Sequence, residues 1–582
     1  MIFASQLRAQ LRSALLLPAL AATALFVLLL VLDGCSAGDP PDPAAPPELP
    51  EAPAPDLPGA TSHEAIFAHV YYKDEADLQR IVEELDALEE ADRQAGWVGV
   101  LLTTEQYDEL VAGGYRIDVV RRERLGLRSI TNYSCYRTVE ETRTALTAIA
   151  TANPTLATLV DIGDSWDKVT PNTPSGADRP GYDLLVLKLT NSAIPGPKPA
   201  FFLMGGIHAR EYTTSETVMR FAEQIVNGYG TDPDATWLLD HHELHVLPHT
   251  NPDGRKQAEQ GYYQRKNRNP VGATTCSNPP TSSNQYGVDL NRNYSFKFGG
   301  ASTSTSKCNA TYLGPAADSE PETKAVESYL ASIYPDQRGP LDTDAAPATA
   351  TGLLITLHSY AQLVLYPWGF STTPPPNAAQ LATLGRKFGF HNGYSVCQPG
   401  VCLYAASGVT EDWAYGTLGV AGYTFEMGTA FFESCSSFTN TVLPPNLNAI
   451  RYAFKAARRP YQAPAGPESL SVAVSPTTVT AGTAVTLTAT ANDTRYNSNG
   501  YGTEPTQSIA AARYSVDNPS WAAGATLTSM SATDGAFNAT SEGVRAVVDT
   551  GGWTPGRHLI LVESQDAAGN WGVPSAVFVT IQ

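Results

Sequence analysis

A short apolar run that ends in two glycines and a His-x-x-Glu pair constrains this chain more than any other feature. Residues 200–204 (AFFLM) read as a buried strand, Gly205-Gly206 allows a sharp turn, and His208 and Glu211 follow at once. Ligands and catalytic groups collect at the carboxyl ends of strands in open α/β sheets. Because zinc accepts imidazole nitrogen and carboxylate oxygen, the pair indicates a metal site, although the same spacing also occurs on surface turns.

Apolar strand candidates alternate with helical stretches across residues 129–460. The helical stretches are 138–151, 214–226, 320–333, 378–388 and 444–457, and the strand candidates are 183–189, 198–204, 243–248, 353–357 and 422–425. This alternation predicts an α/β domain with a mixed, mostly parallel sheet flanked by helices. About 330 residues suffice for one large layered domain.

The first 37 residues resemble an export signal. Arg8 and Arg12 precede an almost wholly apolar run, 14–32, which leads to Cys35. This resembles a bacterial signal peptide with a lipoprotein cleavage site, at which a lipid on Cys35 would anchor the protein to a membrane. Asp33 is unusual in such a site, so ordinary cleavage and a retained anchor stay open. We predict an exported bacterial protein, either secreted or an outer-membrane or cell-surface lipoprotein.

Two segments lie between that signal and residue 129. Residues 38–61 are Pro, Ala and acidic residues without a basic side chain, which is typical of an extended, solvated spacer. Residues 62–124 form a small α/β unit that is marginal alone. Its strand-like runs are 65–72, 97–102 and 115–120, and its helical stretches are 76–88 and 104–112. It ends in a basic stretch, 121–124, which is either a protease-sensitive junction or a solvated linker.

The character of the chain changes after a Pro- and Gly-containing hinge at 460–467. Residues 468–582 are rich in Thr, Val, Ser and Ala, and their short alternating runs lie between Gly, Pro and Asn turns. This predicts an all-β sandwich of immunoglobulin-like size. Residues 566–571 (DAAGNW) resemble a turn motif of sandwich domains appended to secreted bacterial enzymes. The sequence indicates no partner for this domain.

Charge and cysteine content narrow the classes of function. A net charge of −20 argues against nucleic acid as a partner, because no basic face is present to neutralise phosphates. Six cysteines besides Cys35 form an even number, which indicates disulfides in an exported protein. The plausible pairs are Cys276 with Cys308 and Cys397 with Cys402, which leaves Cys135 with Cys435.

If His208 and Glu211 hold a metal, a third ligand must lie at the end of a neighbouring strand. His358 ends the apolar run 353–357, and a buried imidazole needs a partner, either a metal or a hydrogen bond. Glu426 follows 422–425 in the same way and is either a general base or a salt-bridged core carboxylate. A second group of four histidines is expected to be structural or to lie on the surface, because the zinc needs no further protein ligands: His241, His242, His245 and His249.

The motifs of residues 129–460, taken in order, resemble those of the M14 zinc carboxypeptidases. His208-x-x-Glu211 and His358-Ser359-Tyr360 resemble the ligands of one zinc ion per catalytic domain, and Glu426 resembles the catalytic glutamate. Arg265 lies at the place of the arginine that stabilises the oxyanion. The resemblance implies substrate-binding roles for Arg210, Asn291, Arg292 and Tyr404, an orienting role for Asp289 behind His208, and a disulfide between Cys276 and Cys308.

The chemistry implied by this resemblance is that of a metallocarboxypeptidase acting on peptide and protein C-termini. Two imidazoles and one carboxylate leave a zinc position open for water. Glu426 would take the proton of that water, and Arg265 would share the charge that develops on the carbonyl oxygen. Arg292 could make two parallel hydrogen bonds to a terminal carboxylate, which a mid-chain peptide lacks.

A further residue bears on substrate preference. In this family the residue before an Asp-Trp pair lies at the base of the pocket for the C-terminal side chain, and here it is Glu411, before Asp412-Trp413. A carboxylate there predicts a preference for C-terminal Lys or Arg. Glu411 could also point away or pair within the protein, which would give a mixed preference.

One domain assignment and two alternative functions remain open. The unit at 62–124 resembles the N-terminal propeptide of such enzymes in size and placement alone. An exported enzyme of the same fold could instead trim murein peptides of the cell wall. A non-catalytic surface-binding protein, with the sandwich as its functional part, fits less well because Glu426, Arg265 and Arg292 are all present.

Overall fold

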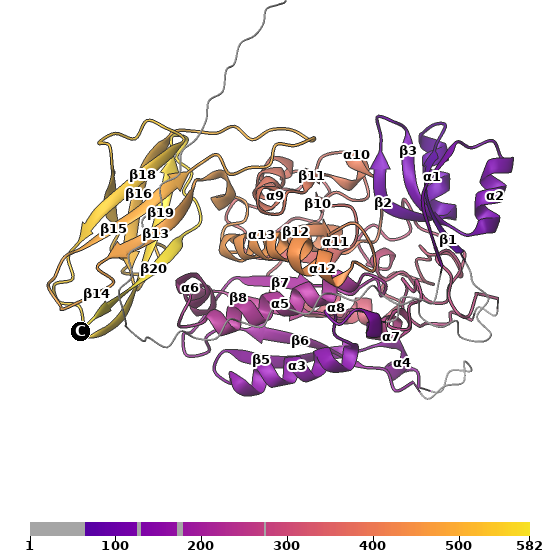
Figure 1. Cartoon of the computed structure of the whole chain (residues 1–582), viewed down its shortest axis with the longest axis horizontal. Helices are drawn as coiled ribbons and strands as arrows, with labels where there is room; N and C mark the ends of the chain where they lie inside the picture. Colours follow the sequence, from indigo (N-terminus) through magenta and orange to yellow (C-terminus); the bar gives the residue numbers. More distant parts are fainter. Residues whose placement is uncertain (1–63, 125–129, 172–178, 273–274) are drawn as a thin grey trace, which may run out of the picture. The chain divides into compact units, whose positions relative to one another are not determined.

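The computed structural model describes residues 64–124, 130–171, 179–272 and 275–582 (Figure 1). The export signal predicted at 1–37 and the spacer predicted at 38–61 lie outside the described residues. Within the described ranges, no helix is long and apolar enough to cross a membrane. Export and lipidation at Cys35 therefore stay predictions.

Residues 64–124 form a small unit with an antiparallel sheet of order β2-β3-β1-β4. One face of the sheet packs on helical residues such as Leu78 and Ile81, and the opposite face places Phe67 and Leu101 in the core of the large domain. The elements are β1 (Glu64–Tyr71), α1 (Glu75–Glu84), β2 (Asp86–Asp92), β3 (Trp97–Leu102), α2 (Thr104–Ala112) and β4 (Ile117–Arg124).

Two expectations for this unit were wrong. The predicted helix 76–88 ends at Glu84, because residues 86–92 pair with β3 as an additional strand. The sequence of β2, DALEEAD, consists mostly of good helix formers, so pairing with a neighbouring strand overrides local propensity here. The basic stretch 121–124 is the end of β4, which pairs with β1, so the solvated-linker alternative is wrong, whereas the protease-sensitive junction stays a prediction.

The large domain is built on an eight-stranded sheet of order β11-β10-β12-β9-β7-β8-β6-β5 (Figure 1). Four of the seven neighbouring pairs are parallel, and they include the central run β12-β9-β7-β8. The mixed, mostly parallel sheet that the alternating pattern predicted is therefore confirmed. The strands are β5 (Ala157–Asp164), β6 (Asp183–Leu189), β7 (Ala200–Met204), β8 (Glu243–Leu247), β9 (Leu353–His358), β10 (Leu363–Leu365), β11 (Ser395–Cys397) and β12 (Ala421–Glu426).

Helices cover both faces of this sheet, because its central strands are apolar on both sides. Phe201 and Leu203 of β7 share a core with α5, α9 and α13, whereas Phe202 and Met204 share one with α8 and α11. The main helices are α3 (Val139–Ala152), α5 (Tyr212–Gly228), α6 (Pro233–His241), α7 (Pro252–Ala258), α8 (Pro321–Ile333), α9 (Ala378–Asn392), α11 (Thr410–Leu418) and α13 (Leu443–Ala456). Shorter helices are α4 (Trp166–Val169), α10 (Pro399–Cys402) and α12 (Cys435–Ser437).

Three disulfides join the six cysteines that the structure describes. Cys276 pairs with Cys308, Cys397 with Cys402, and Cys135 with Cys435. All three predicted pairings are confirmed. The last of them closes a loop of 300 residues, and in the chain-entropy model a long loop restricts the unfolded chain most.

Residues 468–582 form an all-β domain with one core. Its strands have the order β13-β15-β18-β17-β16-β19-β20-β14, and residues from both halves of that order, such as Leu487 of β15 and Ile560 of β19, lie in the same core. This agrees with the predicted sandwich, and its immunoglobulin likeness stays a prediction. The strands are β13 (Glu468–Ser475), β14 (Thr478–Val479), β15 (Val485–Asn492), β16 (Ile509–Val516), β17 (Thr528–Ala532), β18 (Ser541–Val548), β19 (Gly556–Asp566) and β20 (Ser575–Ile581).

The β-domain packs on helices of the large domain through buried polar and aromatic contacts. Asn497 donates from Nδ2 to the carbonyl oxygens of Gly389 (3.1 Å) and Tyr394 (2.7 Å) at the end of α9. The Gly389 carbonyl also accepts the backbone N–H of Gly393, so Asn497 adds a second hydrogen bond there and ties the β-domain to the segment that follows α9. Trp521 packs on Trp237 and His242 with ring centroids 6.1 and 6.2 Å apart.

His242 makes the stability of this junction dependent on pH. It is fully buried among aromatic rings, and neither ring nitrogen has a hydrogen-bond partner. Burial, and then the charge of Arg458, holds the pKa of His242 well below its usual range. Below pH of about 6.5 the unfolded chain therefore binds a proton that the folded chain rejects, and the free energy of unfolding falls as pH falls.

We expect a His242→Phe variant to lose less stability than the native chain on acidification. Between pH 7.5 and 5.5 the difference in unfolding free energy attributable to this one group is about 1.4 kcal/mol. Urea unfolding of both proteins at the two pH values measures it. Equal losses in the two proteins would show that His242 does not titrate differently on folding.

Candidate active site

The sheet brings the ends of three neighbouring parallel strands together. His358 ends β9 and Glu426 ends β12, and the two residues are directly paired in the parallel register. The chain leaves β7 through Gly206, which has a φ of 63°. A Cβ atom at Gly206 would lie 2.7 Å from Ser215 Oγ and 2.9 Å from the carbonyl oxygen of Pro248, so only glycine fits this turn. His208 and Glu211 follow it, at the start of α5.

The side chains of His208, Glu211 and His358 converge on one point. His208 Nδ1 lies 2.7 Å from Glu211 Oε1 and 3.1 Å from His358 Nδ1, and His358 Nδ1 lies 3.4 Å from Glu211 Oε2. Ligand atoms about 2.0–2.2 Å from a tetrahedral zinc ion lie roughly 3.3 Å apart, so these separations fit zinc. All three residues are buried, and they form one group with the geometry of a metal site.

Electrostatics favours the protonation states that a metal site needs at His358 and Glu211. At His208, burial and the charge of Arg265 lower the pKa, but the carboxylates of Glu211 and Asp289 outweigh them and raise it. Burial lowers the pKa of His358 to about 4, which leaves the ring neutral with a lone pair for a metal. Burial opposes ionisation of Glu211, but the neighbouring His208 and His358 outweigh it and hold the pKa of that carboxyl well below its usual range. Glu211 is also fixed by the backbone N–H of Ser359, which donates to Oε2 (3.1 Å).

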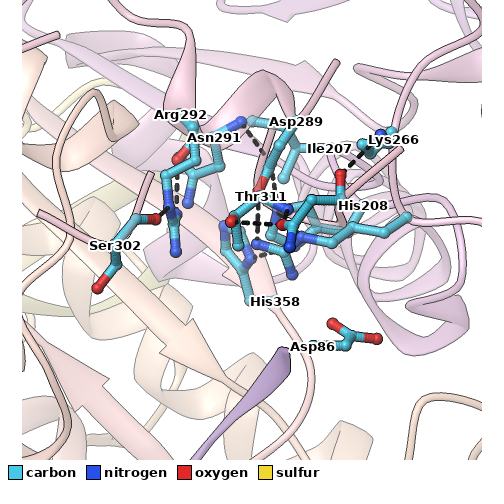
Figure 2. Close-up of polar contacts among 12 residues, drawn as sticks. Asp86, Ile207, His208, Lys266, Asp289, Asn291, Arg292, Ser302, Thr311 and His358 are labelled. Atoms are coloured by element: carbon cyan, nitrogen blue, oxygen red, sulfur yellow. Dashed lines mark hydrogen bonds and ion pairs between the residues drawn. The ribbon is translucent and has the colours of Figure 1, made fainter. Parts of the chain in front are cut away.

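Asp289 lies behind His208, as Figure 2 shows, and joins it to Arg265. His208 Nε2 donates to Asp289 Oδ1 (3.2 Å), and Arg265 Nε donates to Asp289 Oδ2 (3.0 Å). Despite its burial, the charge of Arg265 and the bond from His208 hold the pKa of Asp289 well below its usual range. The Asp289 carboxylate thus orients both His208 and Arg265, two of the site residues predicted from the sequence.

Asn291 and Arg292 are held from behind by the backbone (Figure 2). Arg292 donates from Nε to the carbonyl oxygen of Ser302 (2.8 Å) and from Nη1 to that of Asn291 (2.7 Å). No hydrogen bond from Nη2 is made within the described part of the chain. The Asn291 side chain accepts from the backbone N–H and hydroxyl of Thr410, both at 3.1 Å. The Arg292 guanidinium is therefore fixed in place beside the segment that carries Glu411.

Glu411 is a buried carboxylate in the first turn of α11. It is 4% exposed, and Oε2 has no hydrogen-bond partner. Burial raises the pKa of Glu411, and the nearby Arg292 opposes that rise. The side chain of the next residue, Asp412, already has hydrogen-bond partners, because it accepts the backbone N–H groups of Gly369 and Phe370. Glu411 therefore holds a carboxylate oxygen that the protein itself leaves without a hydrogen bond.

Arg210 makes a contact that the sequence did not predict. It is completely buried and forms a two-pronged ion pair with Asp86, from Nη1 to Oδ2 (2.6 Å) and from Nη2 to Oδ1 (3.0 Å). Asp86 is the first residue of β2 in the N-terminal unit, and Figure 2 draws it on the same side of the site as His358 but without a contact to either histidine. The arginine expected to contact substrate is thus occupied by a carboxylate of this chain.

Further contacts tie the N-terminal unit to the surroundings of the site. Tyr404 is buried in a hydrophobic cluster that includes Leu85 and Val100 of that unit. Asn309 Nδ2 donates to the carbonyl oxygens of Glu83 (3.0 Å) and Glu84 (3.2 Å) at the end of α1. The unit therefore touches the segment of Tyr404 as well as Arg210.

The second histidine group lies outside the metal site. Among the described residues, His241, His242, His245 and His249 belong to no group with metal-binding geometry. His245 bonds to Tyr329 (2.8 Å), and His249 bonds to Ser215 (3.1 Å) and Thr142 (3.2 Å). The prediction that His245 and His249 are structural is confirmed.

Residues 142–443, more than half of the chain, match the family model described as zinc carboxypeptidase, Peptidase_M14. The chain belongs to the zinc carboxypeptidase family. The three ligand atoms found above fit the metal that gives this family its name, and the zinc ligands that the resemblance implied are the residues that come together here.

Curated proteins that are similar in sequence to this chain are also carboxypeptidases. Carboxypeptidase A2 of rat is 34% identical over 310 residues, which covers 52% of this chain and 64% of that protein. Carboxypeptidase A2 of mouse is 33% identical over 304 residues, covering 51% and 63%. The match thus spans less than two thirds of the length of these relatives.

Solved structures agree with the fold. Carboxypeptidase A from Helicoverpa armigera has a TM-score of 0.53 at 21% identity, covering 68% of this chain and 97% of that one. Thrombin activatable fibrinolysis inhibitor has a TM-score of 0.53 at 20% identity, covering 68% of this chain and 99% of that one. At these identities the likeness shows the zinc carboxypeptidase fold.

Proposed function

We propose that the chain is a zinc-dependent metallocarboxypeptidase that hydrolyses the last peptide bond of peptides and proteins, with a preference for C-terminal Lys or Arg. The convergence of His208, Glu211 and His358 at the end of the strand beside Glu426 carries this proposal. Zinc bound there would supply Lewis-acid chemistry, polarising the scissile carbonyl and making water a stronger nucleophile.

The residues around the ligands supply the remaining chemistry. Glu426 takes a proton from the attacking water and returns it to the leaving amine. Arg265, held by Asp289, stabilises the negative charge that develops on the carbonyl oxygen. Arg292 and Asn291 bind the terminal carboxylate, and Tyr404 closes over it. A peptide bond in mid-chain offers Arg292 no carboxylate, so cleavage is restricted to the C-terminus.

The preference for basic residues rests on Glu411. Its buried carboxylate has an oxygen without a hydrogen bond, and a buried polar group in that state is costly. The ammonium of Lys or the guanidinium of Arg would satisfy it, whereas an apolar side chain would leave it unpaired. The named relatives are carboxypeptidases A, so the preference is argued from this residue and not from them.

Peptides that differ only in their last residue test both the activity and the preference. We expect metal-dependent release, abolished by a chelator, that is faster for Arg and Lys than for Leu and Phe. Murein peptides ending in diaminopimelate form a second substrate class, because that residue also carries an amine. Release of no terminal residue in any assay would contradict the function, and faster release of Phe or Leu than of Arg would contradict the preference.

We expect Glu411→Gln to lower kcat/KM for C-terminal Arg and Lys by about 10–100-fold, because a charge-assisted hydrogen bond contributes roughly 1.5–3 kcal/mol. Release of Leu or Phe should change far less, because neither side chain offers Glu411 a donor. A matched control is Glu433→Gln, which alters another buried carboxylate that accepts the backbone N–H groups of Thr429 and Ala430. An equal loss for all four peptides would assign Glu411 a structural role.

We also propose that residues 62–124 act as a propeptide-like unit that covers the cleft in the intact chain. The ion pair between Asp86 and Arg210 and the packing of Tyr404 against the unit support this. In the same proposal the chain is exported, with lipidation at Cys35 as one mode of anchoring, and residues 468–582 are an immunoglobulin-like appendage.

A further inference from the structure

His358 needs a partner for its second ring nitrogen as well as for the first. Its Nδ1 faces His208 Nδ1 and Glu211 Oε2, the other atoms of the metal site. A neutral ring that presents the Nδ1 lone pair to a metal carries its proton on Nε2. His358 is 1% exposed, so bulk water cannot accept that proton's hydrogen bond.

Thr356 lies where the acceptor is needed. Its Oγ1 is 3.2 Å from His358 Nε2, and among the described residues that nitrogen makes no other hydrogen bond. Residues two apart in a strand point to the same face, so β9 itself sets this pairing. Thr356 is fully buried in a central strand, and its β-branched side chain is restricted in rotation.

We infer that Thr356 is a positioning residue for the zinc site, which fixes the tautomer and ring orientation of His358 by accepting its Nε2–H. Asp289 has the same role for His208, because its Oδ1 lies 3.2 Å from His208 Nε2 and accepts the hydrogen bond from that nitrogen. The two histidines therefore have different supports, one carboxylate and one neutral hydroxyl. The neutral support orients the ring without adding a third negative charge around the two histidines, where Glu211 and Asp289 already contribute two.

The inference rests on the proposed binding of zinc, and its test is zinc affinity, which needs no peptide cleavage. Competition with a chromophoric chelator gives the dissociation constant of zinc for the full chain. Thr356→Val preserves the side-chain shape and removes the acceptor, so we expect the dissociation constant to rise about 10–100-fold. Thr356→Ser retains the hydroxyl and should restore affinity to within about threefold of the native chain.

Thr424→Val is the matched control. Thr424 pairs directly with Thr356 in the register of β12 and β9, is also buried, and makes no hydrogen bond to a zinc ligand within the described part of the chain. It should leave zinc affinity unchanged. If Thr356→Val does not fold, Thr356→Ser and Thr356→Ala differ from each other by the hydroxyl alone and give the same comparison.

The outcomes separate this inference from the proposed function. A native chain that binds no zinc would contradict the proposed function. A native chain that binds zinc, with Thr356→Val or Thr356→Ala binding it as tightly as Thr356→Ser, would overturn the role of Thr356. Loss of affinity in Thr424→Val equal to that in Thr356→Val would also overturn it, because any buried hydroxyl of the sheet would then have the same effect.

Discussion

Glu426→Gln is expected to lower kcat by about 10²–10⁴-fold, the range that loss of a positioned general acid–base produces. Glutamine has nearly the same shape as glutamate, but its amide can neither take the proton of the attacking water nor pass one to the leaving amine. Glu426 is buried at the end of β12 and paired in register with His358. It is not one of the three converging ligands, so zinc affinity should stay at the native value.

The measurement combines steady-state hydrolysis of a peptide ending in Arg with zinc titration of the same preparation. Glu433→Gln, a few residues further along the chain, is the control and should change kcat by no more than a few-fold. Full activity in Glu426→Gln would refute the general acid–base role. A parallel loss of zinc would instead show that Glu426 supports the metal site.

Hydrophobic pattern predicted most of the sheet. Strand β6 was predicted at its observed bounds, and β8, β9 and β12 were predicted to within one residue at each end. Strands β8, β9 and β12 lie inside the large domain, where burial on both faces produces continuous apolar runs that the sequence displays directly, whereas β6 alternates between buried and partly exposed residues. The same logic placed His358 and Glu426 at strand ends, and the structure brings those ends together.

The features that were missed depend on contacts between distant residues. Strand β2 has a helix-forming sequence and exists because β3 pairs with it. The ion pair of Asp86 with Arg210 joins residues 124 positions apart, so no local pattern could indicate it. Thr356 is different, because the period of two in a strand places it beside His358, and the sequence alone could have nominated it.

Asp86→Asn is expected to raise the activity of the intact chain by about 10²–10³-fold, provided that the N-terminal unit covers the cleft. Removing one partner of a buried ion pair costs roughly 3–5 kcal/mol, because the other charge stays buried without compensation. Arg210 is 0% exposed and Asp86 is 1% exposed, so solvent does not screen this pair. This cost is present only while the N-terminal unit is docked over the cleft, because the ion pair exists only in that state. The fraction of molecules with the unit undocked, and hence with an open cleft, therefore rises by the corresponding factor until all molecules are open.

Hydrolysis is measured for the intact chain and again after cleavage following the basic end of β4, with native protein and variant side by side. After cleavage the two should be equally active, because Asp86 leaves with the unit and Arg210 becomes available to substrate. Glu75→Gln is the control: its ion pair with Arg93 (2.8 Å) belongs to the same unit, but Glu75 is 69% exposed, and such pairs contribute about 0–1 kcal/mol. If the intact native chain already equals the cleaved one, the unit does not cover the cleft. Another outcome is that cleavage activates the native chain while Asp86→Asn leaves the intact chain inactive. That result would show that the unit is held in place by contacts such as those of Asn309 and Tyr404 and not by the buried ion pair.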